Sequence, residues 1–464
     1  MKVDVLKTSI VRPADEVTGS RPRSAQHHHR LWLSNLDLLH GRIHVRTVFF
    51  YRPGDDTYYS SSSPASKESY FDARLLKDAL SQALVAFYPF AGRLARDEKG
   101  RLEVHCNGEG VMFREAEADV SLDELGEFEP GAELLKLLPS VDYSGGISSY
   151  PLMFSKVTRF RCGGVSLGIG THHSLVDGES AMSLINAWAN TARGFPPVVS
   201  PFLDRTILRA RNPPAPKFHH SEYDPSPVLI NGTPNRTENP TAMAVLTFTP
   251  DQLNALRKQV NPNQYSKSKA GYSTYQILTA HIWRCVSRAR GLADDQPTRL
   301  HMSVDGRSRL TNPPVPTGYF GNMIFHATPT AVAGELVSEP IVRTLERIRR
   351  AIDRMDDEYL RSAIDYLEDP IDPNGVMQVP ETCRSPNLKI ISWIRLPFEF
   401  TDFGWGRPTD YRPASLFEGK GNLLPWNGDG SLSLAICLEA DAMVSFQQLV
   451  HDVDSGWEKF TARL

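Results

Sequence analysis

The sequence is poor in the residues and patterns that mark several classes of protein. Its 464 residues include five cysteines, an odd number without metal-ligand spacing, so neither a disulfide framework nor a cysteine metal site is indicated. No apolar run approaches membrane-spanning length, and the N-terminus lacks the charged and apolar regions of a secretion signal. We therefore expect a cytoplasmic protein with reduced thiols and no membrane contact.

The sequence also has little excess of one charge over the other. The formal net charge is -3 at pH 7, and no basic run is dense enough to indicate nucleic-acid binding. The chain has no repeat of fixed period, which excludes solenoids and propellers. His27, His28 and His29 stand among arginines, a pattern typical of a solvated surface insertion rather than a metal site. The sequence thus predicts small-molecule partners, no nucleic acid and no metal.

The length predicts two domains. A chain of this size with 41% hydrophobic residues can bury two cores. Between them, residues 194–241 are too rich in proline for long helices or strands. We predict an N-terminal domain at 1–193, a crossover linker at 194–241 and a C-terminal domain at 242–464, in a monomer.

Apolar periodicity predicts a mixed α/β protein. The expected helices are 73–85, 181–188, 274–288 and 340–357, and the expected strands are 153–160, 165–170 and 432–438.

The most distinctive stretch is THHSLVDG at 171–178, between an expected strand and an expected helix. This context places His173 on a sharp turn, where a rigid scaffold can direct an imidazole into a cleft. An imidazole with an ordinary pKa of about 6.5 is largely neutral near pH 7 and can accept a proton. His173 is therefore the candidate general base.

The motifs carry a family resemblance. HSLVDG at 173–178 and DFGWG at 402–406 resemble the paired HxxxDG and DFGWG motifs of the plant BAHD acyl-CoA-dependent acyltransferases. DGRSR at 305–309, GYFGN at 318–322 and YPFAGRL at 88–94 are also similar to that family, and other segments resemble its hydroxycinnamoyl-CoA shikimate/quinate branch. The resemblance implies two chloramphenicol-acetyltransferase-like domains with a channel between them, and acyl-CoA as a co-substrate without a permanently bound cofactor.

Within this resemblance, His173 is the base and the indole N–H of Trp405 is a candidate donor to the oxyanion. The alternative is that the 402–406 motif, with Asp402 and Gly404, only packs a loop. Asp177 is expected to be structural and paired with an arginine, not with the histidine.

Two further motif residues receive structural expectations. Gly178 is expected where a tight turn needs a residue without Cβ constraints. Arg307 is expected in a buried ion pair at the domain interface.

Coenzyme A binding is less visible in the sequence. Ser266, Lys267 and Lys269, before the helix start at Ser273, offer cations and backbone N–H groups for phosphates. A solvated lysine run is the other interpretation, and the sequence leaves both open.

The acceptor pocket departs from the branch that the chain resembles. Ungapped counting places Gln378 where that branch has an arginine for a substrate carboxylate, although Arg384 lies only six residues away. Ile391 and Phe49 replace hydroxyl-bearing residues of the pocket.

The other expected acceptor residues are His44, Trp393 and Glu399. A carboxylate such as Glu399 or Glu381 is expected to attract an ammonium group. We therefore predict an amine acceptor such as tryptamine or tyramine, with O-acylation of shikimate or quinate as the alternative.

A rival from another class of enzyme is a serine hydrolase. GVSLG at 164–168 matches the G-x-S-x-G pattern, in which Ser166 would be the nucleophile. Apolar residues continue beyond Ser166, which favours a strand interior over the required strand-to-helix turn.

Overall fold

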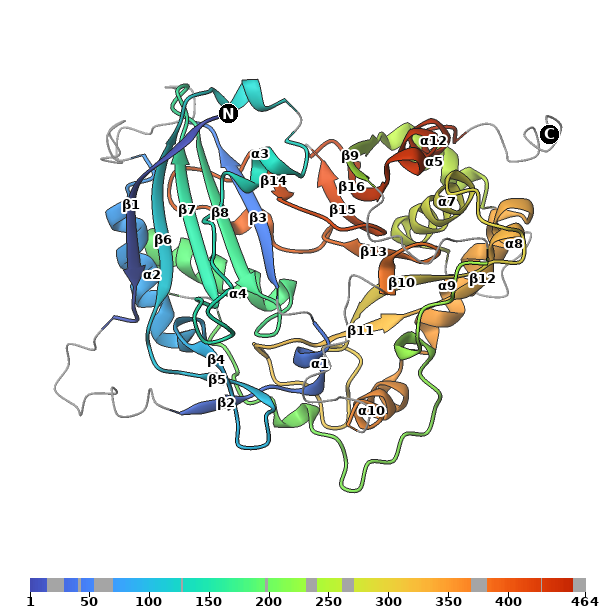
Figure 1. The fold of residues 1–464 in the computed structure, drawn as a ribbon, viewed down its shortest axis with the longest axis horizontal. Coiled ribbons are helices and arrows are strands. Elements are labelled where there is room, and N and C mark those ends of the chain that lie inside the picture. Colours follow the sequence, from blue (N-terminus) through green and yellow to red (C-terminus); the bar gives the residue numbers. More distant parts are fainter. Residues whose placement is uncertain are drawn as a thin grey trace.

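The computed structural model shows two sheet-based halves side by side (Figure 1). It describes residues 1–14, 29–40, 43–53, 70–126, 128–196, 199–230, 240–260, 271–368, 382–426 and 428–453. The mixed α/β class predicted from the sequence is confirmed. No helix in these ranges is both long and apolar enough to cross a membrane.

The first sheet belongs mainly to the N-terminal half. Its strands, in sheet order, are β1 (Val3–Val11), β6 (Val111–Ala118), β7 (Met153–Arg159), β8 (Val165–His172), β3 (His44–Tyr51) and β14 (Asp410–Pro413). All neighbours are antiparallel except β6 and β7. A small sheet of β2 (Arg30–Trp32), β5 (Leu102–His105) and β4 (Arg93–Arg96) lies beside it.

The second sheet belongs to the C-terminal half. Its strands, in sheet order, are β11 (Ile324–Ala327), β10 (Pro297–Asp305), β13 (Leu388–Ser392), β15 (Lys420–Trp426), β16 (Ser431–Glu439) and β9 (Thr241–Phe248), with β12 (Thr330–Val332) also paired to β10. β13 is parallel to both β10 and β15.

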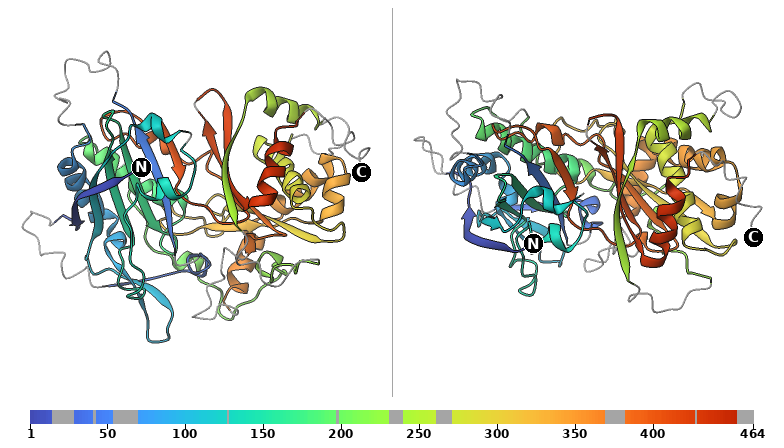
Figure 2. Two further views of the ribbon diagram at one scale, coloured as in Figure 1. Left: turned by 45° about the horizontal axis from the view of Figure 1, so that its top comes forward. Right: turned by 90° about the horizontal axis from the view of Figure 1, so that it is seen from above.

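Helices cover each sheet. Those of the first half are α2 (Ala73–Ala86), α3 (Ala132–Leu135) and α4 (Gly178–Ala192). The others are α1 (Asn35–Leu38), α5 (Pro250–Lys258), α7 (Thr274–Ala289), α8 (Ala333–Ser338), α9 (Ile341–Asp353), α10 (Asp357–Tyr366) and α12 (Ala440–Val450). The helices that follow β9 and β10 lie on one side of the second sheet, the side that faces away from the first half (Figure 2).

Local sequence explains why the main helices begin where they do. Asp72 caps α2, because its carboxylate accepts hydrogen bonds from the Arg74 and Leu75 backbone N–H groups. Asp177 caps α4 in the same way, because its carboxylate accepts a hydrogen bond from the Ser180 backbone N–H. The expected helix at 340–357 is wrong as a single element: it ends at Asp353, and Asp356 caps a new helix, α10.

The predicted division of the chain did not anticipate two exchanges between the halves. β14 hydrogen-bonds to β3, so a segment from beyond residue 242 completes the first sheet. Leu36 and Leu39 pack in the core of the second half, although they lie before residue 193. These crossings hold the two sheets together around the space between them.

The two faces of the second sheet have different surroundings. Leu300, Met302, Leu388 and Ile390 point into the helix-covered core. Because side chains alternate along a strand, the residues between them point toward the first half. This alternation decides which residues of the second sheet line the site.

Candidate active site

A cavity of about 420 Å³ lies between the two sheets and is lined by both halves of the chain. One wall comes from β3, β8 and α4, and the other comes from alternate residues of β10, β11, β13 and β15. His173 is part of the lining, so the structure brings the candidate base to an interdomain space.

His173 follows the last residue of β8 on the turn that leads into α4. Its backbone N–H donates to the Ile43 carbonyl at 2.9 Å, and the Asn322 side chain donates to the His173 carbonyl at 2.8 Å. The imidazole stacks on the His40 ring, with centroids 3.9 Å apart. Contacts from both halves therefore fix the position of the base.

Burial, reinforced by the nearby Lys420 charge, lowers the pKa of His173 to about 4. The imidazole is then uncharged at neutral pH and available to take a proton from a nucleophile.

Asp177 is paired with an arginine and not with His173. Its carboxylate forms two hydrogen bonds with the Arg307 guanidinium, at 2.8 and 3.0 Å, and accepts from the backbone N–H groups of Ser180 and Met323. Burial alone would raise the pKa of Asp177, but the Arg307 charge and these hydrogen bonds hold it below its ordinary value. Asp177 thus joins the start of α4 to the second half of the chain.

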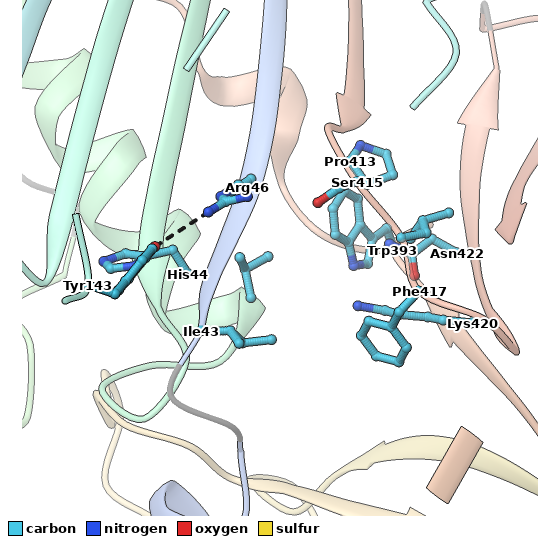
Figure 3. Close-up of a pocket in the computed structure, with 12 residues that line it drawn as sticks. Ile43, His44, Arg46, Tyr143, Trp393, Pro413, Ser415, Phe417, Lys420 and Asn422 are labelled. Atoms are coloured by element: carbon cyan, nitrogen blue, oxygen red, sulfur yellow. Dashed lines mark hydrogen bonds between the residues drawn. The ribbon is translucent and has the colours of Figure 1, made fainter. Parts of the chain in front are cut away.

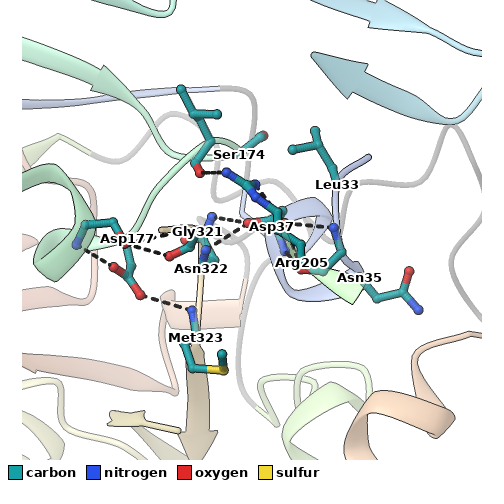
Figure 4. A network of polar contacts seen from close by, with 12 residues as sticks. Leu33, Asn35, Asp37, Ser174, Asp177, Arg205, Gly321, Asn322 and Met323 are labelled. Atoms are coloured by element: carbon teal, nitrogen blue, oxygen red, sulfur yellow. Dashed lines mark hydrogen bonds and ion pairs between the residues drawn. The ribbon is translucent and has the colours of Figure 1, made fainter. Parts of the chain in front are cut away.

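A second buried pair supports the same turn (Figure 4). Asp37 and Arg205 form an ion pair at 2.9 Å, and both side chains are fully buried. Asp37 also accepts hydrogen bonds from the backbone and side chain of Asn322, and Arg205 donates to the Leu175 carbonyl. Sequence reasoning missed these residues, because each partner lies in a distant segment.

The 402–406 motif shapes a loop outside the cavity. The Asp402 carboxylate accepts hydrogen bonds from the backbone N–H groups of Gly404 and Gly406, and both glycines have a φ of +102°. Trp405 stacks on Phe71 with centroids 5.0 Å apart and does not line the cavity with His173. This geometry favours the alternative interpretation of Trp405 as a packing residue, and its role as oxyanion donor gains no support from it.

Gly178 lies where the sequence placed it, but for a different reason. It is the first residue of α4 and has no left-handed φ, so the expected conformational demand of a tight turn is wrong. A Cβ there would approach the Leu396 side chain at 3.1 Å. Gly178 lines the cavity, so its missing side chain leaves room at this wall.

The predicted acceptor residues divide between three places. Phe49, Ile391 and Trp393 line the cavity with His173. His44 lines an adjoining pocket of about 400 Å³, where Tyr143 and the Pro151 carbonyl hold its two ring nitrogens at 2.9 Å (Figure 3).

Glu399 lies in a separate pocket beside Asp402 and Arg407, so the structure does not bring it together with His173. Gln378 and Glu381 lie outside the described residues.

The predicted coenzyme A residues remain largely outside the described chain. This applies to Ser266, Lys267 and Lys269. Ser273 is described as the N-cap of α7, where its hydroxyl accepts from the Gln276 N–H at 3.2 Å. The Ser273 hydroxyl therefore already caps a helix.

The serine-hydrolase alternative is wrong. Ser166 lies inside β8, opposite Phe50 of β3, and is fully buried. A nucleophile elbow would instead present the hydroxyl at an exposed strand-to-helix turn.

The cavity residues that sequence reasoning missed include His40, His326, Lys389 and Lys420. The last three alternate with core residues on β11, β13 and β15, and Lys389 interrupts an apolar strand. A polar residue at alternate positions of an otherwise buried strand was the available signal.

The comparisons with known proteins agree with this architecture. A family model described as the Transferase family matches residues 1–453. A hydroxycinnamoyltransferase of Narcissus pseudonarcissus is 47% identical over 98% of this chain and 100% of its own length. A hydroxycinnamoyl-CoA:5-hydroxyanthranilate N-hydroxycinnamoyltransferase of Avena sativa is also 47% identical, with 98% and 100% covered.

A shikimate O-hydroxycinnamoyltransferase of Nicotiana tabacum is 45% identical, over 97% of this chain and 100% of its own. The crystal structure of vinorine synthase has the same fold, with a TM-score of 0.70 and 24% identity over 98% of this chain and 100% of that one. The chain therefore belongs to the BAHD Transferase family and is an acyl-CoA-dependent acyltransferase.

Proposed function

We propose that this enzyme transfers a hydroxycinnamoyl group from coenzyme A to the nitrogen of an aromatic amine. The observation that carries the proposal is the cavity wall, where Phe49 and Ile391 contribute apolar side chains to the lining that contains His173. A polyhydroxylated acceptor would leave hydroxyl groups unpaired against this wall, at a cost of about 1–3 kcal/mol each. An aromatic ring has no such cost.

In the proposed reaction the amine attacks the thioester carbonyl directly. His173 accepts the proton that the nitrogen loses as the C–N bond forms, and it then protonates the coenzyme A thiolate as the C–S bond breaks. No acyl-enzyme is formed. Trp393 lines the cavity and offers an indole N–H, so it replaces Trp405 as the candidate donor to the tetrahedral oxyanion.

The structure changes which amine we propose. Tryptamine and tyramine carry an ammonium group at neutral pH. From the sequence we expected a carboxylate such as Glu399 to attract this group. Glu399 lies outside the cavity, so this support is missing. An aromatic amine is uncharged at neutral pH and needs no such partner. The N-acylating relative from Avena sativa supports anthranilate-type acceptors.

The test compares acceptors against one donor. With p-coumaroyl-CoA, we expect anthranilate to give a higher kcat/KM than tryptamine, tyramine or shikimate, with an amide as the product. Faster turnover of shikimate would overturn the proposal and favour O-acylation, the activity named for the relative from Nicotiana tabacum. Faster turnover of tryptamine would keep N-acylation but reject an aromatic amine.

A further inference from the structure

Two lysines face each other across neighbouring strands of the second sheet. Lys389 of β13 and Lys420 of β15 are direct partners in the register, and both line the cavity that contains His173. Only 4% of Lys389 is exposed. Lys420 lies where the cavity meets the adjoining pocket, and Figure 3 shows its ammonium group beside Trp393.

Neither ammonium group has a carboxylate ion-pair partner among the described residues. Lys389 Nζ has a long contact of 3.5 Å to His326 Nε2, and Lys420 Nζ lies 5.0 Å from the centre of the Phe417 ring. Like charges that face each other on one side of a sheet repel, and a buried charge without a counter-charge is costly. Burial lowers the pKa of both lysines, to about 8 for Lys420, and no described carboxylate offsets this effect.

Among the residues that the structure describes, the groups around the lysines add no negative charge. His301 is the register partner of Lys389 on β10, and His326 and His40 line the cavity nearby. The acidic side chains in the lining are Asp177, Glu179 and Asp305, and all three interact with Arg307. Within the described part of the chain, the two lysines of the cavity have no carboxylate partner, whereas its acidic side chains are already paired with Arg307.

We propose that Lys389 and Lys420 bind a carboxylate carried by the acceptor. Two ammonium groups on adjacent strands can each donate to one carboxylate oxygen, which neutralises both buried charges. The inference rests on the proposed acyl transfer, but it does not depend on whether the acceptor nucleophile is nitrogen or oxygen.

The position of the lysines favours the acceptor over the coenzyme A phosphates. The thioester must reach His173 for transfer, and the pantetheine arm separates that sulfur from the phosphates. Lys389 and Lys420 line the same cavity as His173, so they lie at the reacting end of the substrates. The remaining source of a carboxylate at this end is an acidic acyl group, which the test includes as a separate arm.

The first experiment measures kcat and KM for anthranilate and its methyl ester with p-coumaroyl-CoA. The variants are Lys389→Met and Lys420→Met, which keep an unbranched side chain. Loss of a charge-assisted hydrogen bond should raise the KM for anthranilate by about 10- to 100-fold and leave the ester nearly unchanged. Equal effects on acid and ester would overturn the proposal.

Lys156→Met is the matched control. Lys156 is also 4% exposed, but it lies in the first sheet, where its ammonium group donates to the Lys136 carbonyl at 2.8 Å. This variant should leave the ratio of the two KM values unchanged. A shift in that ratio as large as in the cavity variants would show a general effect of removing a buried lysine and would overturn the assignment.

The second experiment needs no catalysis. Benzoate and benzamide have similar shapes but differ in charge, and calorimetry can measure their binding to the purified protein. Benzoate should bind the wild type at least about tenfold more tightly, and this preference should be lost in both cavity variants. Absence of the preference in the wild type would overturn the carboxylate site. If neither anthranilate nor its ester is acylated, only the proposed function fails, because this binding result is independent of it.

A donor arm distinguishes the source of the carboxylate. The cavity variants are tested with malonyl-CoA and acetyl-CoA and one uncharged amine, aniline. Similar effects on the two donors support the acceptor assignment. A loss confined to malonyl-CoA would overturn it and move the carboxylate to the acyl group.

Discussion

Asp177 and Arg307 form a two-point ion pair between the halves of the enzyme, with nitrogen–oxygen distances of 2.8 and 3.0 Å. Asp177 stands four residues after His173 and caps α4, whereas Arg307 follows β10. The pair therefore fixes the catalytic turn of one half to the second sheet of the other. We therefore propose a positioning role for the aspartate.

Breaking this pair should destabilise the protein strongly. We expect Asp177→Asn to lower the free energy of unfolding by about 3–5 kcal/mol, because Arg307 would lose its most buried counter-charge and keep only the more exposed Asp305 and Glu179. Urea denaturation measures this loss. Glu346→Gln removes a surface pair with Arg343 and should change stability by less than about 1 kcal/mol. Equal stability of the two variants would contradict the structural role of Asp177.

Removal of the His173 imidazole should abolish acyl transfer. We expect His173→Ala to lower kcat by about 10²- to 10⁴-fold, the usual contribution of a general base. Coenzyme A binding, measured by calorimetry, should be nearly unchanged because the backbone contacts of residue 173 do not need the ring. Retained turnover, or an acyl-enzyme in the mass spectrum of the wild type, would reject the mechanism.

The two tryptophans should respond differently to substitution. Trp393→Phe removes an indole N–H from the cavity and should lower kcat by about 10²-fold if Trp393 stabilises the oxyanion. Trp405→Phe keeps an aromatic ring against Phe71 and should leave kcat nearly unchanged. Steady-state kinetics of both variants decides between them, and the reverse order would restore the role first expected for Trp405.

The pH dependence of kcat should have a low acid limb. Because burial lowers the pKa of His173 to about 4, the imidazole is the free base at pH 6 and above. We expect kcat to be flat from pH 6 to 7.5 and to fall by half only near pH 4 to 5, provided the protein stays folded. An acid limb with a midpoint at 6.5 would show that His173 is not desolvated in the working enzyme.

Stability should respond to acid at a higher pH than catalysis. Burial lowers the pKa of His44 and His281 to about 4 and of His301 to about 3. The unfolded chain binds these protons below about pH 6.5 and the folded protein does not, so their contribution is complete above that pH and is lost as the pH falls.

Each such group should cost about 1.4 kcal/mol per pH unit between its two pKa values. Urea denaturation at pH 7.5, 6.5 and 5.5 should show little change over the first interval and a clear loss over the second. A stability that rises on acidification would contradict these directions.

The sequence predicted the parts of the site that are local. The turn at His173 follows from a strand and a capped helix that adjoin each other, and each is specified by its own periodicity. The loop at 402–406 shows the limit of such local prediction. Its motif is visible in the sequence, yet the direction of the Trp405 side chain depends on packing with Phe71, more than 300 residues earlier.

The sequence by itself determined the family, the mixed α/β class, several of the main helices and the candidate base, because these depend on local patterning and adjacent residues. Only the tertiary structure decided which side chains share the cavity. Lys389 and Lys420 are 31 residues apart in the chain and unremarkable there. Strand register places them face to face, and the opposing sheet encloses them, so their charge becomes a property of the site only when the two halves pack together.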